Sequence, residues 1–231
     1  MISSHSKRRE FTEGLILDDG FLPDILEIML EAWSLVSIHD KKTLEPRITA
    51  LWQIQCCHVN QSRYFEFGSP WKIETHFDFF HEVQNNDPVT GKQISRKDIV
   101  VRLYGSIPCN SAARNAPYLV VESKKLMTSR DISEYVGENG MLCFLNGKYD
   151  PFKSHVAMAA YVMTDEIDEI KNDVLRKIKS LSDRLNIADI FTSWAILPEY
   201  PRHSTTQHLV KGMPISIHHL FLEANIEKWK Q

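Results

Sequence analysis

The segment from Tyr118 to Lys125 reads Tyr-Leu-Val-Val-Glu-Ser-Lys-Lys, an apolar run that ends in an acid and a base. Because a strand turns successive side chains to opposite faces, Glu122 and Lys124 share one face and Ser123 points away. A carboxylate and an ammonium at the end of a buried strand must be paired, hydrated or used, since a lone buried charge is costly. The pattern therefore indicates a polar site where this strand ends.

A second acid opens the preceding apolar run. Asp98 stands directly before Ile-Val-Val in the stretch 97–104. If the two strands pair, Asp98 and Glu122 can meet at one point with Lys124 beside them. Two carboxylates and a lysine on neighbouring strands suit a hard divalent cation and a water molecule to be activated, which is the chemistry of metal-assisted hydrolysis.

The elements that must position these residues alternate between helical and strand-like patterns. Apolar spacing of three and four predicts helices, and apolar runs or alternation predict strands. The predicted helices are 22–37, 43–58, 129–146 and 165–185, and the predicted strands are 71–83, 97–104, 117–123, 155–163, 191–197, 207–210 and 215–222. Helices interleaved with strands predict an α/β (α+β) protein with a mixed central sheet flanked by helices. No boundary for a second domain is visible, so we expect one domain over residues 1–231.

Composition narrows the possible functions. The chain has 231 residues, of which 43% are hydrophobic and 25% charged, and a net charge of −3, so a nucleic-acid contact would need a local basic patch. The four cysteines have no CxxC spacing, which favours free thiols over a zinc site or a disulfide framework. The basic N-terminal residues are not followed by an apolar core, and no apolar run of about 18 residues exists. We therefore expect a cytoplasmic protein without a signal peptide or a membrane span.

The order of these elements and residues resembles the PD-(D/E)xK, or restriction-endonuclease-like, nuclease superfamily. The motif stands here as Asp98, Glu122, Ser123 and Lys124, with Lys97 at the position where the consensus has proline.

The resemblance covers about residues 40–165 and leaves a C-terminal β elaboration at about 190–223. The stretch 140–149 and the strand after it also resemble segments of bacterial restriction or phage-defence proteins.

The resemblance implies a role for each residue of the motif. Asp98, Glu122 and the backbone carbonyl of Ser123 would hold Mg²⁺ or Mn²⁺. Lys124 would orient or help to deprotonate the attacking water, and Glu45, on the helix before the sheet, is similar to an acid that many members place near the metal. Lys125, Arg130 and Lys148 are candidates for contacts with the nucleic acid.

The activity implied is a metal-dependent nuclease that cleaves DNA, an endonuclease acting in a bacterial anti-phage (antiviral) defence or restriction system. Since no recognition module is visible, the chain would need a protein partner such as a helicase or an ATPase, or a homodimer, to select its target.

Several alternatives stay open on the sequence alone. The acids and lysines could form ordinary ion pairs on a wet sheet edge, which are worth little energetically. Glu45 could be a first-turn acid favoured by the helix dipole, and Lys148 a cation near a helix C-terminus. Lys125 and Arg130 could lie on a solvated face. The chain could also be a non-catalytic subunit that keeps the fold and binds a partner or nucleic acid, or a nuclease acting on RNA.

Overall fold

The computed structural model describes residues 21–66, 76–86, 93–104, 118–148, 154–189, 197 and 200–224. The helices in these ranges are α1 (Leu22–Ser34), α2 (Glu45–Glu66), α4 (Ser129–Val136), α5 (Leu142–Leu145) and α6 (Ile167–Ser180). The strands are β1 (His76–Asn86), β2 (Gln93–Tyr104), β3 (Leu119–Leu126), β4 (His155–Val162), β5 (Ile187–Asp189), β6 (His203–Val210) and β7 (Met213–Glu223).

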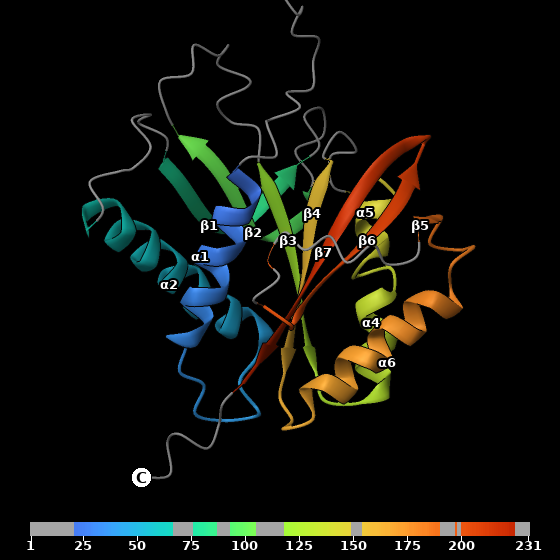
Figure 1. The fold of residues 1–231 in the computed structure, drawn as a ribbon, viewed down its shortest axis with the longest axis horizontal. Helices are drawn as coiled ribbons and strands as arrows, with labels where there is room; N and C mark the ends of the chain where they lie inside the picture. Colours follow the sequence, from blue (N-terminus) through green and yellow to red (C-terminus); the bar gives the residue numbers. More distant parts are fainter. Residues whose placement is uncertain are drawn as a thin grey trace, which may run out of the picture.

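Within the described ranges, seven strands form one mixed sheet in the order β1-β2-β3-β4-β7-β6-β5 (Figure 1). Strands β1, β2 and β3 form an antiparallel meander, and β3, β4 and β7 run parallel to one another. Strands β6 and β5 then extend the sheet with antiparallel pairing. The central parallel strands are buried on both faces, as expected when helices connect and cover them.

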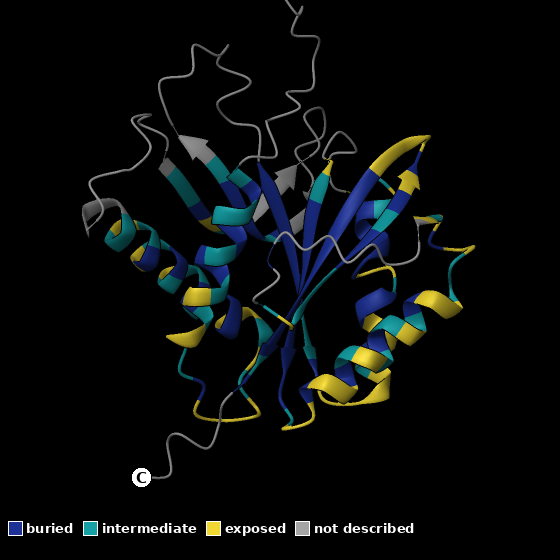
Figure 2. Cartoon of the chain, in the orientation of Figure 1, coloured by how far each residue is buried: buried dark blue, intermediate teal, exposed yellow. Residues whose placement is uncertain are grey.

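Helices cover both faces of the sheet. Helices α1 and α2 pack on one face, and α4, α5 and α6 pack on the other (Figure 1). Figure 2 shows the centre of the sheet buried between these layers, with exposed residues on the outer sides of the helices. The predicted class, a mixed sheet flanked by helices, is therefore confirmed.

The boundaries of two predicted helices are wrong. The helix predicted over 43–58 begins at Glu45 and continues to Glu66. The helix predicted over 129–146 is two helices, because α4 ends at Val136 and a turn containing Gly137 and Gly140 separates it from α5.

The break between α4 and α5 has a steric cause. A Cβ at Gly140 would lie 2.0 Å from the carbonyl oxygen of Tyr135, so only glycine permits this close backbone approach. The amide of Met141 then donates to the same Tyr135 carbonyl at 2.9 Å, which closes the end of α4.

Other elements appear as predicted with small shifts. Strand β4 and helices α1 and α6 lie within the predicted ranges, and β6 and β7 are longer than predicted. The strand predicted over 191–197 lies outside the described residues except for Leu197, as do the first residues of the strand predicted over 71–83. Among the helices that are described, none has the length and apolar character needed to cross a membrane.

Candidate active site

The predicted site lies where β2 parts from β3. The two strands pair antiparallel, with Ile99 opposite Val121 and Val101 opposite Leu119. Continued by one residue, this register places Asp98 opposite Glu122, so both side chains project from the same face of the sheet. The pairing of β2 with β3 stops at Ile99 and Val121. Beyond Val121, the side chains of Asp98 and Glu45 contact this edge of β3.

Two of the predicted acids bind the backbone along this edge of β3. Oδ2 of Asp98 accepts a hydrogen bond from the amide of Ser123 at 2.7 Å. Oε2 of Glu45, at the first residue of α2, accepts one from the amide of Lys125 at 2.8 Å. Amides two residues apart point to the same edge of a strand, so carboxylates take the places that a neighbouring strand would fill.

The third acid is paired with the lysine of the motif. The ammonium of Lys124 lies 2.8 Å from Oε1 of Glu122 and 2.8 Å from the carbonyl oxygen of Ser123. It also lies 3.5 Å from Oε1 of Glu45. The side chains of Lys124 and Glu122 are only 14% and 8% exposed, so this is a buried ion pair and the alternative of wet surface pairs does not describe it.

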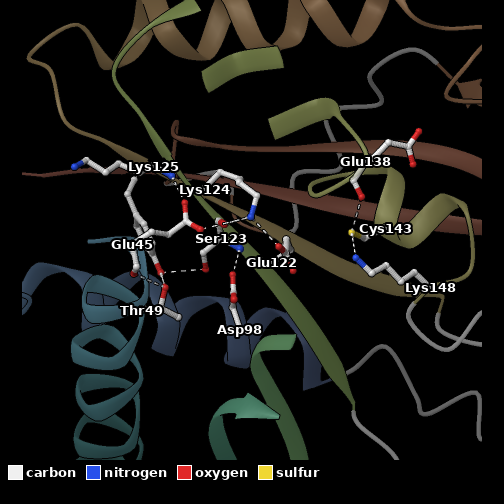
Figure 3. A network of polar contacts seen from close by, with 11 residues as sticks. Glu45, Thr49, Asp98, Glu122, Ser123, Lys124, Lys125, Glu138, Cys143 and Lys148 are labelled. Atoms are coloured by element: carbon white, nitrogen blue, oxygen red, sulfur yellow. Dashed lines mark hydrogen bonds and ion pairs between the residues drawn. The ribbon is translucent and has the colours of Figure 1, made fainter. Parts of the chain in front are cut away.

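The charges around Lys124 determine its protonation. Burial alone lowers the pKa of Lys124, but the carboxylates of Glu122, Glu45 and Asp98 raise it more, and the net pKa lies above its ordinary value. Lys124 is therefore an ammonium ion at neutral pH. Lys124 thus joins Glu122, Glu45 and the carbonyl of Ser123, while Asp98 holds the amide of the same serine (Figure 3).

A hydroxyl chain fixes Ser123 from the opposite face of the sheet. The hydroxyl of Tyr161, on β4, lies 3.1 Å from Oγ of Ser123 and 3.0 Å from Oγ1 of Thr49. Thr49 in turn donates to the carbonyl of Glu45 at 3.0 Å. Because Thr49 donates its only proton to that carbonyl, its oxygen accepts the hydrogen bond from the Tyr161 hydroxyl. The Ser123 hydroxyl then donates to the oxygen of Tyr161. The chain ties β3, β4 and the first turn of α2 together.

The ring of Tyr161 is held independently of its hydroxyl. It stacks on Trp33 with the ring centroids 5.2 Å apart and meets the edge of Trp52 at 5.9 Å. Neither Tyr161 nor Thr49 is among the predicted site residues, because one lies in an apolar strand and the other in the interior of a predicted helix. The register pairs Ser123 with Ala159 and places Tyr161 two residues further along the same face of β4.

The three predicted nucleic-acid contacts lie in different surroundings. The ammonium of Lys125 donates to the carbonyls of Lys41 and Thr43, in the turn before α2. Arg130 is highly exposed on α4 and pairs with Glu134 one turn later at 3.5 Å. These two cations are therefore not gathered with the carboxylates.

Lys148 lies on the face of the sheet that Glu122 also faces. Its ammonium is 3.8 Å from Sγ of Cys143, which donates to the carbonyl of Glu138 at 3.0 Å (Figure 3). Helix α5 packs on this face through Cys143, and the residues of β3 with the same parity as Glu122 point to it. Lys148 is thus the predicted cation that lies on the side of the sheet to which Glu122 points.

The histidines belong to other parts of the sheet. His218 stacks between His155 and His203, with contacts of 3.0 Å and 3.3 Å, while His219 lies against Tyr135 on α4. The adjacent residues His218 and His219 therefore face opposite sides of β7. Burial lowers the pKa of His203 to about 4.

A fully buried chain runs along the α4 side of β6 and β7. His208 donates from Nδ1 to the carbonyl of Leu185 at 2.7 Å, so its Nε2 accepts from Thr206 at 2.7 Å. Thr206 accepts from Nε2 of His219 at 2.9 Å, and Nδ1 of His219 accepts from Tyr135 at 2.9 Å. Both histidines are neutral in this assignment of protons, and burial lowers the pKa of His219 to about 3.

The donor set of the candidate site suits a small hard cation. In the part of the chain that the structure describes, no three side chains of His, Cys, Asp or Glu are grouped so as to form a metal site by themselves. Mg²⁺ needs fewer, because it binds through one or two carboxylates and keeps waters and substrate oxygens. Glu122, Asp98 and the carbonyl of Ser123 are oxygen donors of this kind, and a cation, the Lys124 ammonium, already lies among them. The residues therefore fit the group that the resemblance implies.

Comparisons of this chain with protein-family models, with curated proteins and with solved structures gave no match.

Proposed function

We propose that the protein is a metal-dependent nuclease that hydrolyses phosphodiester bonds in DNA, with its active site at the divergence of β2 and β3. The observation that carries this proposal is the position of the Lys124 ammonium between Glu122, Glu45 and the carbonyl of Ser123, with Asp98 bound to the amide of the same serine.

Stability accounts for Asp98 and Glu45, which satisfy the amides of Ser123 and Lys125, but not for the Lys124–Glu122 pair. A buried ion pair returns little or no net stability, because desolvation of the two charges offsets their attraction. Apolar residues could fill the space of Glu122 and Lys124 at the end of β3. Charged groups that are held in place despite this cost are concentrated in functional sites, where their charge is used.

The order of the elements also supports the proposal. The resemblance expects an acidic helix, a strand opened by Asp, a strand carrying Glu-x-Lys, a helix and a further strand. Helix α2, strands β2 and β3, helix α4 and strand β4 follow that order, with β3 and β4 parallel.

Each residue has a role that its contacts support. Asp98, Glu122 and the Ser123 carbonyl would hold Mg²⁺ or Mn²⁺, with Glu45 beside them, and the bound ion would polarise the phosphoryl oxygen and lower the pKa of the attacking water. Lys124 would orient the water and offset the charge that develops on the phosphate. Lys148 is the candidate for a contact with the nucleic-acid backbone.

Target selection would depend on another molecule. The chain has a net charge of −3, and two of its three candidate phosphate-binding cations are engaged elsewhere or exposed on α4. We propose that a protein partner such as a helicase or an ATPase, or a second copy of the chain, supplies the remaining contacts, in a cytoplasmic defence or restriction system.

The direct test is cleavage by the purified chain. Plasmid DNA and a single-stranded RNA would be incubated with excess protein and Mg²⁺ or Mn²⁺, using the wild type, Glu122→Gln and Lys124→Ala. We expect DNA cleavage that falls at least a hundredfold in both variants. Lys171→Met is the matched control, because it removes an exposed lysine that donates to the carbonyl of Pro201.

The outcomes separate the candidate functions. Undiminished cleavage by Lys124→Ala would remove the proposed mechanism, and cleavage of RNA alone would reassign the substrate. Absence of cleavage on either nucleic acid with either metal would favour a non-catalytic subunit that keeps the fold and binds nucleic acid or a partner.

A further inference from the structure

The ammonium of Lys124 occupies a position among the oxygen atoms that a divalent cation would need. Its contacts are Oε1 of Glu122 and the carbonyl of Ser123, both at 2.8 Å, and Oε1 of Glu45 at 3.5 Å. These are three of the four donor residues that the proposed function gives to Mg²⁺, and the fourth, Asp98, holds the amide of Ser123.

An ammonium ion and a divalent cation compete for these donors. Mg²⁺ binds oxygen at about 2.0–2.1 Å, and the lone pairs that accept the ammonium protons are not available to it while Lys124 stays in place. Two cations a few ångströms apart also repel strongly in a site from which water is largely excluded. Glu122 is buried and the side chain of Lys124 is mostly covered, so bulk solvent screens this repulsion only weakly.

We propose that Lys124 holds the cation position in the metal-free protein and must be displaced before a divalent cation binds. This displacement rests on the proposed function and adds the order of events at the site: Lys124 leaves before the metal binds. The displaced ammonium then needs a new anionic partner, and a phosphodiester of the substrate is an anion of the required charge. Metal binding is therefore weak in the free protein and is strengthened when a nucleic-acid phosphate receives Lys124.

This arrangement would restrain the nuclease without a separate inhibitor. A site whose own lysine competes for the metal-binding oxygens stays unloaded until the substrate phosphate arrives. Two of the carboxylates, Asp98 and Glu45, keep their preorganised positions meanwhile, because they are anchored to the amides of Ser123 and Lys125.

The test measures binding of Mn²⁺ alone, by calorimetry and by the electron paramagnetic resonance signal of the free ion, with no nucleic acid present. The variant Lys124→Met removes the ammonium and keeps most of the side-chain volume. We expect Lys124→Met to bind one Mn²⁺ at least tenfold more tightly than the wild type, although the same variant loses cleavage. Lys171→Met should bind as the wild type does, since it removes the same charge at a distant exposed position.

The outcomes are separable from a failure of the proposed function. Equal or weaker binding by Lys124→Met, with binding that still requires Glu122, would overturn the displacement and leave the metal site intact. Absence of Mn²⁺ binding to every variant would overturn the displacement and the metal-dependent function together. If circular dichroism shows that Lys124→Met does not fold, Lys124→Gln replaces it, because an amide keeps a hydrogen-bond donor without the charge.

Discussion

The most specific prediction about stability concerns the hydrogen-bonded hydroxyls of Tyr161, Ser123 and Thr49 behind the candidate active site. Tyr161→Phe removes one oxygen atom and leaves the ring on Trp33 and Trp52. The change deletes the contacts to Ser123 and Thr49. Ser123 and Thr49 are 0% and 1% exposed, so water cannot replace the missing partner.

The magnitude follows from these contacts. A net hydrogen bond is worth about 1 kcal/mol, and a buried hydroxyl left without a partner costs about 1–3 kcal/mol. Thr49 keeps its bond to the carbonyl of Glu45, so we expect Tyr161→Phe to lower the free energy of unfolding by about 2 kcal/mol. For a chain of this size that corresponds to a fall in Tm of roughly 4–8 °C.

A double-mutant cycle with Ser123→Ala isolates the contact. Ser123→Ala alone should cost about 1 kcal/mol, and the double variant should be about 1 kcal/mol more stable than the sum of the single changes predicts, because no unpartnered serine hydroxyl remains. Urea unfolding followed by circular dichroism gives each value. Tyr135→Phe is the control, since its hydroxyl binds His219 on the other face and its effect should add to that of Ser123→Ala. Additivity of Tyr161→Phe and Ser123→Ala within about 0.5 kcal/mol would refute the proposed chain.

Two further perturbations address other parts of the fold. His203 and His219 have pKa values lowered to about 4 and about 3, so the unfolded chain binds protons below pH 6.5 that the folded protein does not. The free energy of unfolding should therefore be highest above pH 6.5 and should fall toward pH 4 by about 1.4 kcal/mol per pH unit for each such histidine. Urea midpoints that stay constant between pH 7 and pH 5 would contradict this expectation. Gly140→Ala places a Cβ 2.0 Å from the carbonyl oxygen of Tyr135 and should lower the free energy of unfolding by about 3 kcal/mol. At Gly212, whose φ is +80°, an added Cβ meets no atom within 4 Å, so Gly212→Ala should cost only the left-handed backbone strain of about 1 kcal/mol. Equal Tm values for the two variants would contradict the steric explanation.

The strand pattern was sufficient to predict the centre of the site. An acid at the head of one strand and Glu-x-Lys at the end of the next placed Asp98 and Glu122 together once antiparallel pairing was assumed, and the register with Ile99 opposite Val121 agrees. The first-turn position of Glu45 was predicted as well. Its bond to the amide of Lys125 could not be, because it depends on the packing of α2 against β3.

The errors in the helices have physical causes. Apolar periodicity fades after His58, but α2 continues because Asn60 donates to the carbonyl of Phe77 at 2.8 Å and Arg63 pairs with Glu27 and Glu31. Polar tertiary contacts of this kind leave no periodic signal in a sequence.

The split between α4 and α5 was different, since its signal was present. The glycines at 137 and 140 were the visible cue, and their meaning depends on how closely the chain approaches Tyr135.

The two carboxylates bound to the edge of β3 bear on how an inactive relative would be recognised. Asp98 and Glu45 satisfy backbone amides, so a related sequence that had lost the proposed activity would still keep them for stability. Their presence in a related sequence therefore says little about activity. Glu122 and Lys124 hold each other instead, and loss of one removes the reason to keep the other. Under the proposed function, degeneration should therefore erase that pair first, and a relative that keeps Glu122 and Lys124 should also keep the activity.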